Sequence, residues 1–126
     1  MTAAYVDSSC LVALLLSEPG SAALARRIER QDVVCTSTFL EAELTAMAVR
    51  EGVAMDERQL DAFAWIQPQR RLTPEIARVL SVRYLRGAGL WHLACALCLF
   101  DDPTGITFLT LDAPQREAAG KLGFLT

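Results

Sequence analysis

Short apolar segments alternate with longer segments of helical periodicity, and this alternation constrains the fold more than any other feature of the sequence. Residues 3–6 (AAYV) form an apolar run that stops abruptly at Asp7, and residues 32–36 and 106–109 form comparable runs. Strands that alternate with helices favour an open parallel sheet covered by helices on both faces. We therefore expect an α/β fold of three layers, α/β/α, with a short central parallel sheet.

Periodicity, turn residues and capping signals place the elements along the chain. We expect strands at residues 3–6, 32–36, 70–72, 106–109 and 123–125, and helices at residues 8–17, 21–30, 38–50, 56–65, 73–86, 90–100 and 112–121. The helix at 56–65 is expected to pack antiparallel to its predecessor. Thr38 is expected to cap the helix at 38–50, with Glu41 as the partner in a capping box.

Length and composition indicate one globular domain over residues 1–126. Apolar residues make up 52% of the chain and charged residues 21%, which is the balance of a folded domain. No apolar run reaches the roughly 18 residues that span a bilayer, and the run at 11–16 follows an acid rather than a basic segment. We therefore expect a cytoplasmic protein without a membrane anchor. The net charge of −3 excludes a polycation built to bind nucleic acid over its whole surface.

The four cysteines each lie in apolar sequence. Cys95 and Cys98 form a CxxC, but they fall within a predicted helix and no second CxxC completes a zinc site. A cytoplasmic chain argues against disulfides. We expect buried thiols that pack as small apolar side chains.

Three carboxylates occupy positions where a parallel sheet would gather ligands. Asp7 and Asp112 each follow a buried run and precede a helix, and Glu43 lies beside the apolar stripe of the helix at 38–50. Each has a simpler interpretation, as a helix cap or a surface charge. Together they would repel one another unless a cation neutralised them, and oxygen ligands without His or Cys suit Mg²⁺ or Mn²⁺. Such a cluster is typical of metal-assisted phosphodiester hydrolysis.

The order and spacing of three motifs resemble the PIN-domain nucleases, and within them the VapC-type toxins of bacterial toxin–antitoxin pairs. The motifs are YVDSSCLVALLL, TSTFLEAELTAMAVREG and FLTLDAPQREAAGKLGF, which carry Asp7, Glu43 and Asp112 respectively. The resemblance covers essentially the whole chain as a single PIN domain. It implies a PIN-like fold and an endoribonuclease in which these three acids hold Mg²⁺ or Mn²⁺ and are catalytic.

The third of the four acids of the resembled family, in chain order, is missing. The family segment reads R-G-A-D-L-W-H-L-A, whereas this chain has Gly89 at the acidic position of RGAGLWHLA. Glycine is an acceptable N-cap, so we expect the fold to survive and metal binding and RNA cleavage to be impaired. A natural glycine would indicate a degraded enzyme kept for partner binding, and an introduced one a disarmed toxin. The sequence leaves both open.

The resemblance also implies supporting residues and partners. Ser8 and Thr110 are expected to orient the acids through hydroxyl hydrogen bonds, with capping or turn formation as the simpler alternative. Arg86 is a candidate RNA contact at the mouth of the site, and His92 is expected to be packed in the fold. The implied partners are an RNA substrate, a VapB-type antitoxin and a second copy of the chain. The alternative function is a catalytically dead PIN-like module that dimerises and binds an antitoxin. A response-regulator receiver is rejected, because the single lysine, Lys121, falls inside the last helix.

Overall fold

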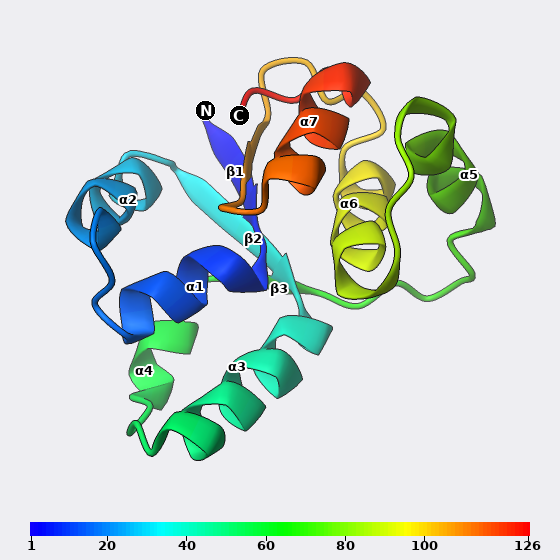
Figure 1. Ribbon diagram of the computed structural model, residues 1–126. Coiled ribbons are helices and arrows are strands. Elements are labelled where there is room, and N and C mark those ends of the chain that lie inside the picture. The colour runs from blue at the N-terminus through cyan, green and yellow to red at the C-terminus, as the bar shows by residue number, and fades with distance from the viewer.

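A four-stranded parallel sheet forms the centre of the protein in the computed structural model, which describes residues 1–126 (Figure 1). The strands are β1 (Ala3–Val6), β2 (Val33–Ser37), β3 (Ala64–Ile66) and β4 (Thr107–Leu109), in the spatial order β3-β2-β1-β4. All three pairings are parallel. Leu125 adds a single parallel bridge to Thr107, which confirms the short pairing expected near the C-terminus.

Helices cover both faces of the sheet, so the expected three-layer α/β/α arrangement is confirmed. They are α1 (Ser8–Leu15), α2 (Ser21–Glu29), α3 (Thr38–Glu51), α4 (Glu57–Leu60), α5 (Thr73–Val82), α6 (Gly87–Leu99) and α7 (Ala113–Leu122). Figure 1 shows α1 to α4 on one side of the sheet and α5 to α7 on the other. No helix is long and apolar enough to cross a membrane.

Alternation of side chains along β1 divides the interior into two cores. Ala4 and Val6 belong to the core beneath α1, α3 and α4, whereas Tyr5 points to the opposite core beneath α5, α6 and α7. Tyr5 stacks on Phe108 of β4, with ring centroids 5.4 Å apart. The central strand is thus buried on both faces, as expected for a parallel sheet.

The predictions for residues 56–72 were wrong. The expected helix at 56–65 is limited to the single turn α4, and the strand lies at Ala64–Ile66 rather than at 70–72. Aromatic and β-branched residues favour a strand here, and pairing of β3 with β2 outweighs a helical periodicity that the sequence also carries. The Trp65 indole nitrogen donates to the carbonyl of Leu60 at 2.9 Å, which fixes the turn between α4 and β3.

Three helix boundaries also differ from the prediction. Ser37, not Thr38, caps α3, because its hydroxyl accepts from the Phe39 amide at 3.1 Å. Helix α5 ends at Val82, four residues early, and residues 83–86 connect it to α6. The N-cap of α6 is Arg86, with no side-chain cap, so Gly89 lies within the first turn and is not the cap.

Candidate functional site

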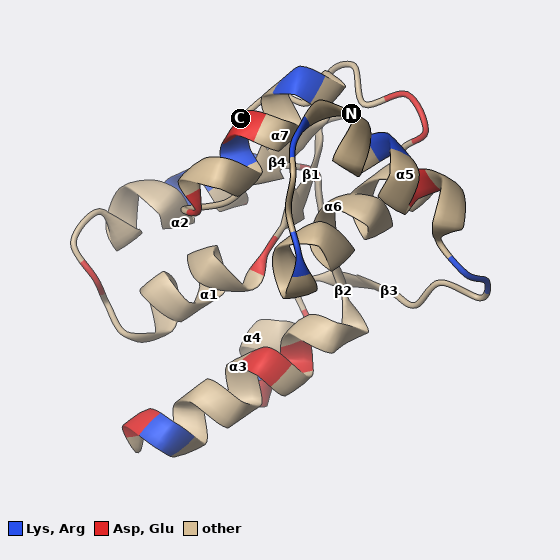
Figure 2. Cartoon of the chain, turned by 45° about the vertical axis from the view of Figure 1, so that its right-hand side comes forward, with Lys and Arg blue, Asp and Glu red and all other residues tan.

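A pocket of about 460 Å³ opens at the carboxyl ends of β1 and β4, and it brings Asp7, Asp112 and Gly89 together. The chain runs from β1 outward through β2 and β3 and then returns to the other side of β1 as β4. The gap between β1 and β4 is therefore the point where strand order reverses, which is where open parallel sheets bind ligands. Figure 2 shows acidic ribbon where β1 joins α1 and on the first half of α3, beside a basic segment that leads into α6.

Asp7 is almost completely buried, with 3% of its surface exposed. Its carboxylate accepts hydrogen bonds from the Ser9 hydroxyl at 2.6 Å, the Thr110 hydroxyl and the Cys10 amide at 3.3 Å. Burial raises the pKa of Asp7, while the hydrogen bonds from Ser9, Thr110 and Cys10 oppose this rise. The residue caps α1, as the simpler interpretation predicts, and it also faces the pocket.

Thr110 links the ends of β1 and β4. Its buried hydroxyl lies within hydrogen-bond distance of Asp7 and of Oε1 of Gln115 at 3.0 Å, and it accepts from the Asp112 amide at 3.0 Å. The Gln115 amide group donates in turn to the carbonyl of Gly89 at 3.1 Å. Gln115 therefore ties α7 to the first turn of α6. Sequence reasoning missed this residue, although its place three positions after the cap Asp112 puts it on the same turn.

Asp112 lies on the solvent-exposed side of the pocket. One of its carboxylate oxygens accepts from the Gln115 amide at 2.9 Å, which caps α7. No hydrogen bond occupies the other oxygen, Oδ1. The residue can therefore serve as a helix cap and a ligand at the same time.

Glu43 reaches the edge of this site from α3, but its carboxylate is held by other side chains. Oε2 accepts from the Ser8 hydroxyl at 3.1 Å, and Oε1 lies 2.7 Å from Nε2 of His92. The other ring nitrogen of His92, Nδ1, lies 2.8 Å from the hydroxyl of Tyr5. His92 is buried, as expected, but its contact with Glu43 was not foreseen.

The contacts from Tyr5 through His92 to Glu43 form a continuous chain, and the tautomer of His92 sets its direction. Burial raises the pKa of Tyr5 far above its usual value, so the hydroxyl keeps its proton and can donate to Nδ1. In the tautomer that accepts at Nδ1, the ring carries its proton on Nε2 and donates it to Glu43. The buried end of this network is thereby connected to a partly exposed carboxylate.

Gly89 leaves room for a side chain in the first turn of α6. A Cβ placed on it would meet only the Cδ of Gln115, at 3.9 Å, which is an ordinary van der Waals contact. Its backbone is not in the left-handed region that favours glycine. Nothing in the packing therefore requires glycine at this position.

Comparison with known protein families matches residues 4–122 to the PIN domain. The chain belongs to the PIN domain family. No significant match was found among curated proteins. PIN domains are typically nucleases that use divalent metal ions, and the match includes all three predicted acids and Gly89.

The donor chemistry of this PIN domain suits a hard cation, although the acids do not converge on one point. No group of three or more His, Cys, Asp or Glu side chains lies close enough together to hold a metal ion. Asp7 and Asp112 share the pocket, whereas Glu43 is engaged by Ser8 and His92. Mg²⁺ keeps several waters in proteins and commonly uses only one or two carboxylates together with substrate phosphates. Asp7 and Asp112 meet that requirement, and Ser8 and Ser9 add hydroxyls to the pocket wall.

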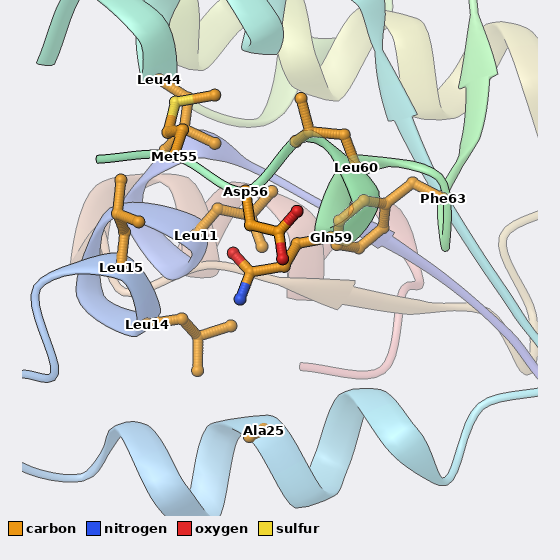
Figure 3. Close-up of a pocket in the computed structure, with 10 residues that line it drawn as sticks. All are labelled: Leu11, Leu14, Leu15, Ala25, Leu44, Met55, Asp56, Gln59, Leu60 and Phe63. Atoms are coloured by element: carbon orange, nitrogen blue, oxygen red, sulfur yellow. The ribbon is translucent and has the colours of Figure 1, made fainter. Parts of the chain in front are cut away.

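A second, apolar pocket lies on the other side of α1 and is separate from the acids. It has a volume of about 360 Å³ and is formed by α1, α2, α3 and α4. Figure 3 shows Leu11, Leu14 and Leu15 of α1 along one side and Leu60 and Phe63 along another. Eight of the ten residues that line it are hydrophobic, so it suits an apolar side chain rather than a charged ligand.

Proposed function

We propose that this PIN domain is the endoribonuclease toxin of a type II toxin–antitoxin pair, of the VapC type, and that Gly89 impairs it. The observation that carries the proposal is the position of Gly89. It lines the same pocket as Asp7 and Asp112, at the start of a helix, and a side chain fits there without steric conflict. The family's acidic residue at this position would complete the oxygen ligands of the pocket.

Each remaining residue has a role that follows from its contacts. Asp7 and Asp112 would hold a divalent cation, Mg²⁺ or Mn²⁺, with Glu43 at the edge of the site. The cation would supply activation of water and stabilisation of the charge that develops on a scissile phosphate. Thr110 and Ser9 fix the orientation of the Asp7 carboxylate, and Ser8 does the same for Glu43. Arg86, exposed at the rim of the pocket, would contact the RNA backbone.

The apolar pocket formed by α1, α2, α3 and α4 supports the proposal that the protein binds an antitoxin. An antitoxin segment with an apolar side chain could occupy it, and a basic residue of the same segment could approach the acids. The alternative function, a catalytically dead module that dimerises and binds an antitoxin, uses the same two surfaces. Restoring the acid at position 89 separates these two functions.

The test compares three proteins: the chain as it stands, Gly89→Asp and Gly120→Asp. Gly120 lies on α7, where an added Cβ would meet no atom within 4 Å, so this variant makes the same chemical change away from the pocket. Mg²⁺- or Mn²⁺-dependent cleavage of a mixed RNA pool is measured with EDTA controls. The shift of Tm on addition of Mg²⁺ is measured in parallel, because a ligand at 100 times its Kd stabilises the folded state by about 2.7 kcal/mol.

We expect chelator-sensitive cleavage and a Mg²⁺-dependent rise in Tm for Gly89→Asp that exceed those of the other two proteins. If Gly89→Asp neither cuts RNA nor responds to metal, the nuclease proposal fails and the binding module takes its place. If the chain with Gly89 is already as active as Gly89→Asp, the proposed impairment is wrong.

A further inference from the structure

The segment that joins α5 to α6, residues 83–86, forms one wall of the acidic pocket. Arg83 and Arg86 have extended backbones, with φ of −163° and −145°. Exposure alternates along the segment: Leu85 is buried, whereas Tyr84 and Arg86 on either side of it are exposed. In an extended segment, residues two apart point to the same side about 7 Å from each other. Tyr84 and Arg86 therefore face solvent together at the rim of the pocket.

The segment is anchored although its two outward side chains are free. The guanidinium of Arg83 donates to Glu117 of α7 at 2.6 Å and to the carbonyl of Tyr84 at 2.9 Å. Leu85 packs into the core beneath α5 to α7. At the end of the segment Gly87, with φ of +59°, turns the chain into α6. These contacts hold the backbone of Tyr84 in place without using its ring.

The Tyr84 ring has no partner within the protein. Its side chain is 72% exposed, none of the aromatic pairs includes it, and its hydroxyl makes no hydrogen bond. Arg86 likewise forms no ion pair with any acid of the chain. Both side chains line the same pocket as Asp7 and Asp112, so a free aromatic ring and a free guanidinium lie side by side at its rim.

We propose that Tyr84 and Arg86 form a subsite for single-stranded RNA, in which a base stacks on the Tyr84 ring and Arg86 contacts the adjoining phosphate. The subsite rests on the proposed nuclease function and deepens it, because it selects unpaired RNA at the rim of the pocket. Bases of a duplex are stacked on one another and cannot use an aromatic ring in this way, whereas unpaired bases can.

Charge complementarity favours RNA over a protein segment at this rim. Arg86 attracts phosphate, and the acids lie deeper in the pocket, at Asp7 and Asp112. At this rim Arg86 attracts the phosphates of RNA and repels a basic side chain, so the basic residue proposed for an antitoxin would reach the acids from another side of the pocket.

Binding of a fluorescein-labelled, mixed-sequence single strand of RNA tests the subsite by anisotropy, in EDTA so that neither cleavage nor metal loading affects the result. Five proteins are compared over a range of salt concentrations: the parent chain, Tyr84→Ala, Tyr84→Phe, Arg86→Ala and Leu80→Ala. Leu80 is an exposed apolar residue of α5 outside the pocket and serves as the matched control. A duplex of the same sequence is titrated in parallel.

We expect Tyr84→Ala to weaken binding of the single strand by about tenfold, since stacking on one aromatic side chain supplies that range of affinity. Tyr84→Phe and Leu80→Ala should stay within about twofold of the parent, and duplex binding should be unchanged by Tyr84→Ala. Arg86→Ala should lower the slope of log affinity against log salt by about 0.7, the contribution of one phosphate contact to a single strand.

Equal binding of the single strand by the parent chain and Tyr84→Ala would overturn the subsite, as would a parent chain that binds no RNA. Neither result bears on cleavage by Gly89→Asp, which tests the nuclease function separately. Conversely, loss of all metal-dependent cleavage together with Tyr84-dependent RNA binding would leave an RNA-binding subsite on a protein that is not a nuclease.

Discussion

Replacing Tyr5 by Phe removes one oxygen atom from the centre of the protein, and the consequence can be worked out from the structure. Tyr5 is fully buried on β1, and its hydroxyl lies 2.8 Å from Nδ1 of His92. The substitution keeps the ring and its stacking on Phe108, so the loss is confined to this hydrogen bond. It also leaves Nδ1 of the buried His92 without its hydrogen-bond partner.

The size of the effect follows from two contributions. A hydrogen bond of this kind contributes about 1 kcal/mol net, and a buried polar atom left unpaired costs about 1–3 kcal/mol. We take about 2 kcal/mol as the expected loss in the free energy of unfolding. At about 2.1 cal/mol/K per residue, the unfolding entropy of 126 residues is about 0.26 kcal/mol/K, so Tm should fall by about 8 °C.

Thermal and urea unfolding followed by circular dichroism measure this loss. The chain has two tyrosines, and Tyr84→Phe makes the same chemical change at an exposed site, where Tm should not move. A Tyr5→Phe protein whose Tm stays within about 1 °C of the parent would refute the reasoning, because the buried hydroxyl would then contribute nothing to the fold. The urea midpoint should fall without a change in m-value.

Two further predictions concern the acids of the pocket. Burial raises the folded-state pKa of Asp7 above its ordinary value of 3.8, so the charged carboxylate destabilises the fold at neutral pH, and stability should rise as the pH falls through the folded pKa. Asp7→Asn should therefore raise Tm at pH 7, by an amount that shrinks as the pH approaches about 4; an Asp7→Asn protein less stable than the parent at pH 7 would contradict this. Asp112→Ala should lower the free energy of unfolding by about 1 kcal/mol through loss of the α7 cap, whereas Asp112→Asn should retain it and still weaken any Mg²⁺-dependent shift in Tm. Equal unfolding free energies for the two Asp112 variants would show that the cap contributes nothing.

The layers of the fold and the positions of Asp7 and Asp112 could be predicted because both follow from local patterns, whereas Glu43 was expected to join them and does not line their pocket. Residues 3–6 and 106–109 are apolar runs that end in polar residues, and a parallel sheet gathers such ends at one edge. Asp7, Asp112 and Gly89 accordingly meet in one pocket. The same local patterns cannot decide between a helix and a strand where a segment carries both signals. At residues 64–66 the outcome depends on pairing with β2, which is a contact between distant parts of the chain.

The contacts that hold the acids could not be predicted, because each joins residues far apart in sequence. His92 contacts Glu43 across 49 positions and Tyr5 across 87. Read alone, a single histidine in an apolar helix indicates only that it is buried. Its hydrogen bonds depend on α3 and α6 lying against the same end of the sheet, and that arrangement is visible only in the structure.

A glycine at position 89 adds no charge to a pocket that already holds two carboxylates. Asp7 is already buried with a raised pKa, and Asp112 faces the same pocket. A further carboxylate in the first turn of α6 would gain a little from the helix dipole, about 0.3–1 kcal/mol, but it would repel both acids in a partly desolvated space. Glycine avoids that repulsion. The side-chain amide of Gln115 donates a hydrogen bond to the Gly89 carbonyl, which keeps the first turn of α6 in place. On the proposed function, an acid at position 89 would oppose folding in the absence of metal and would be stabilising only with a bound cation, so Gly89→Asp should be less stable than the parent chain in EDTA.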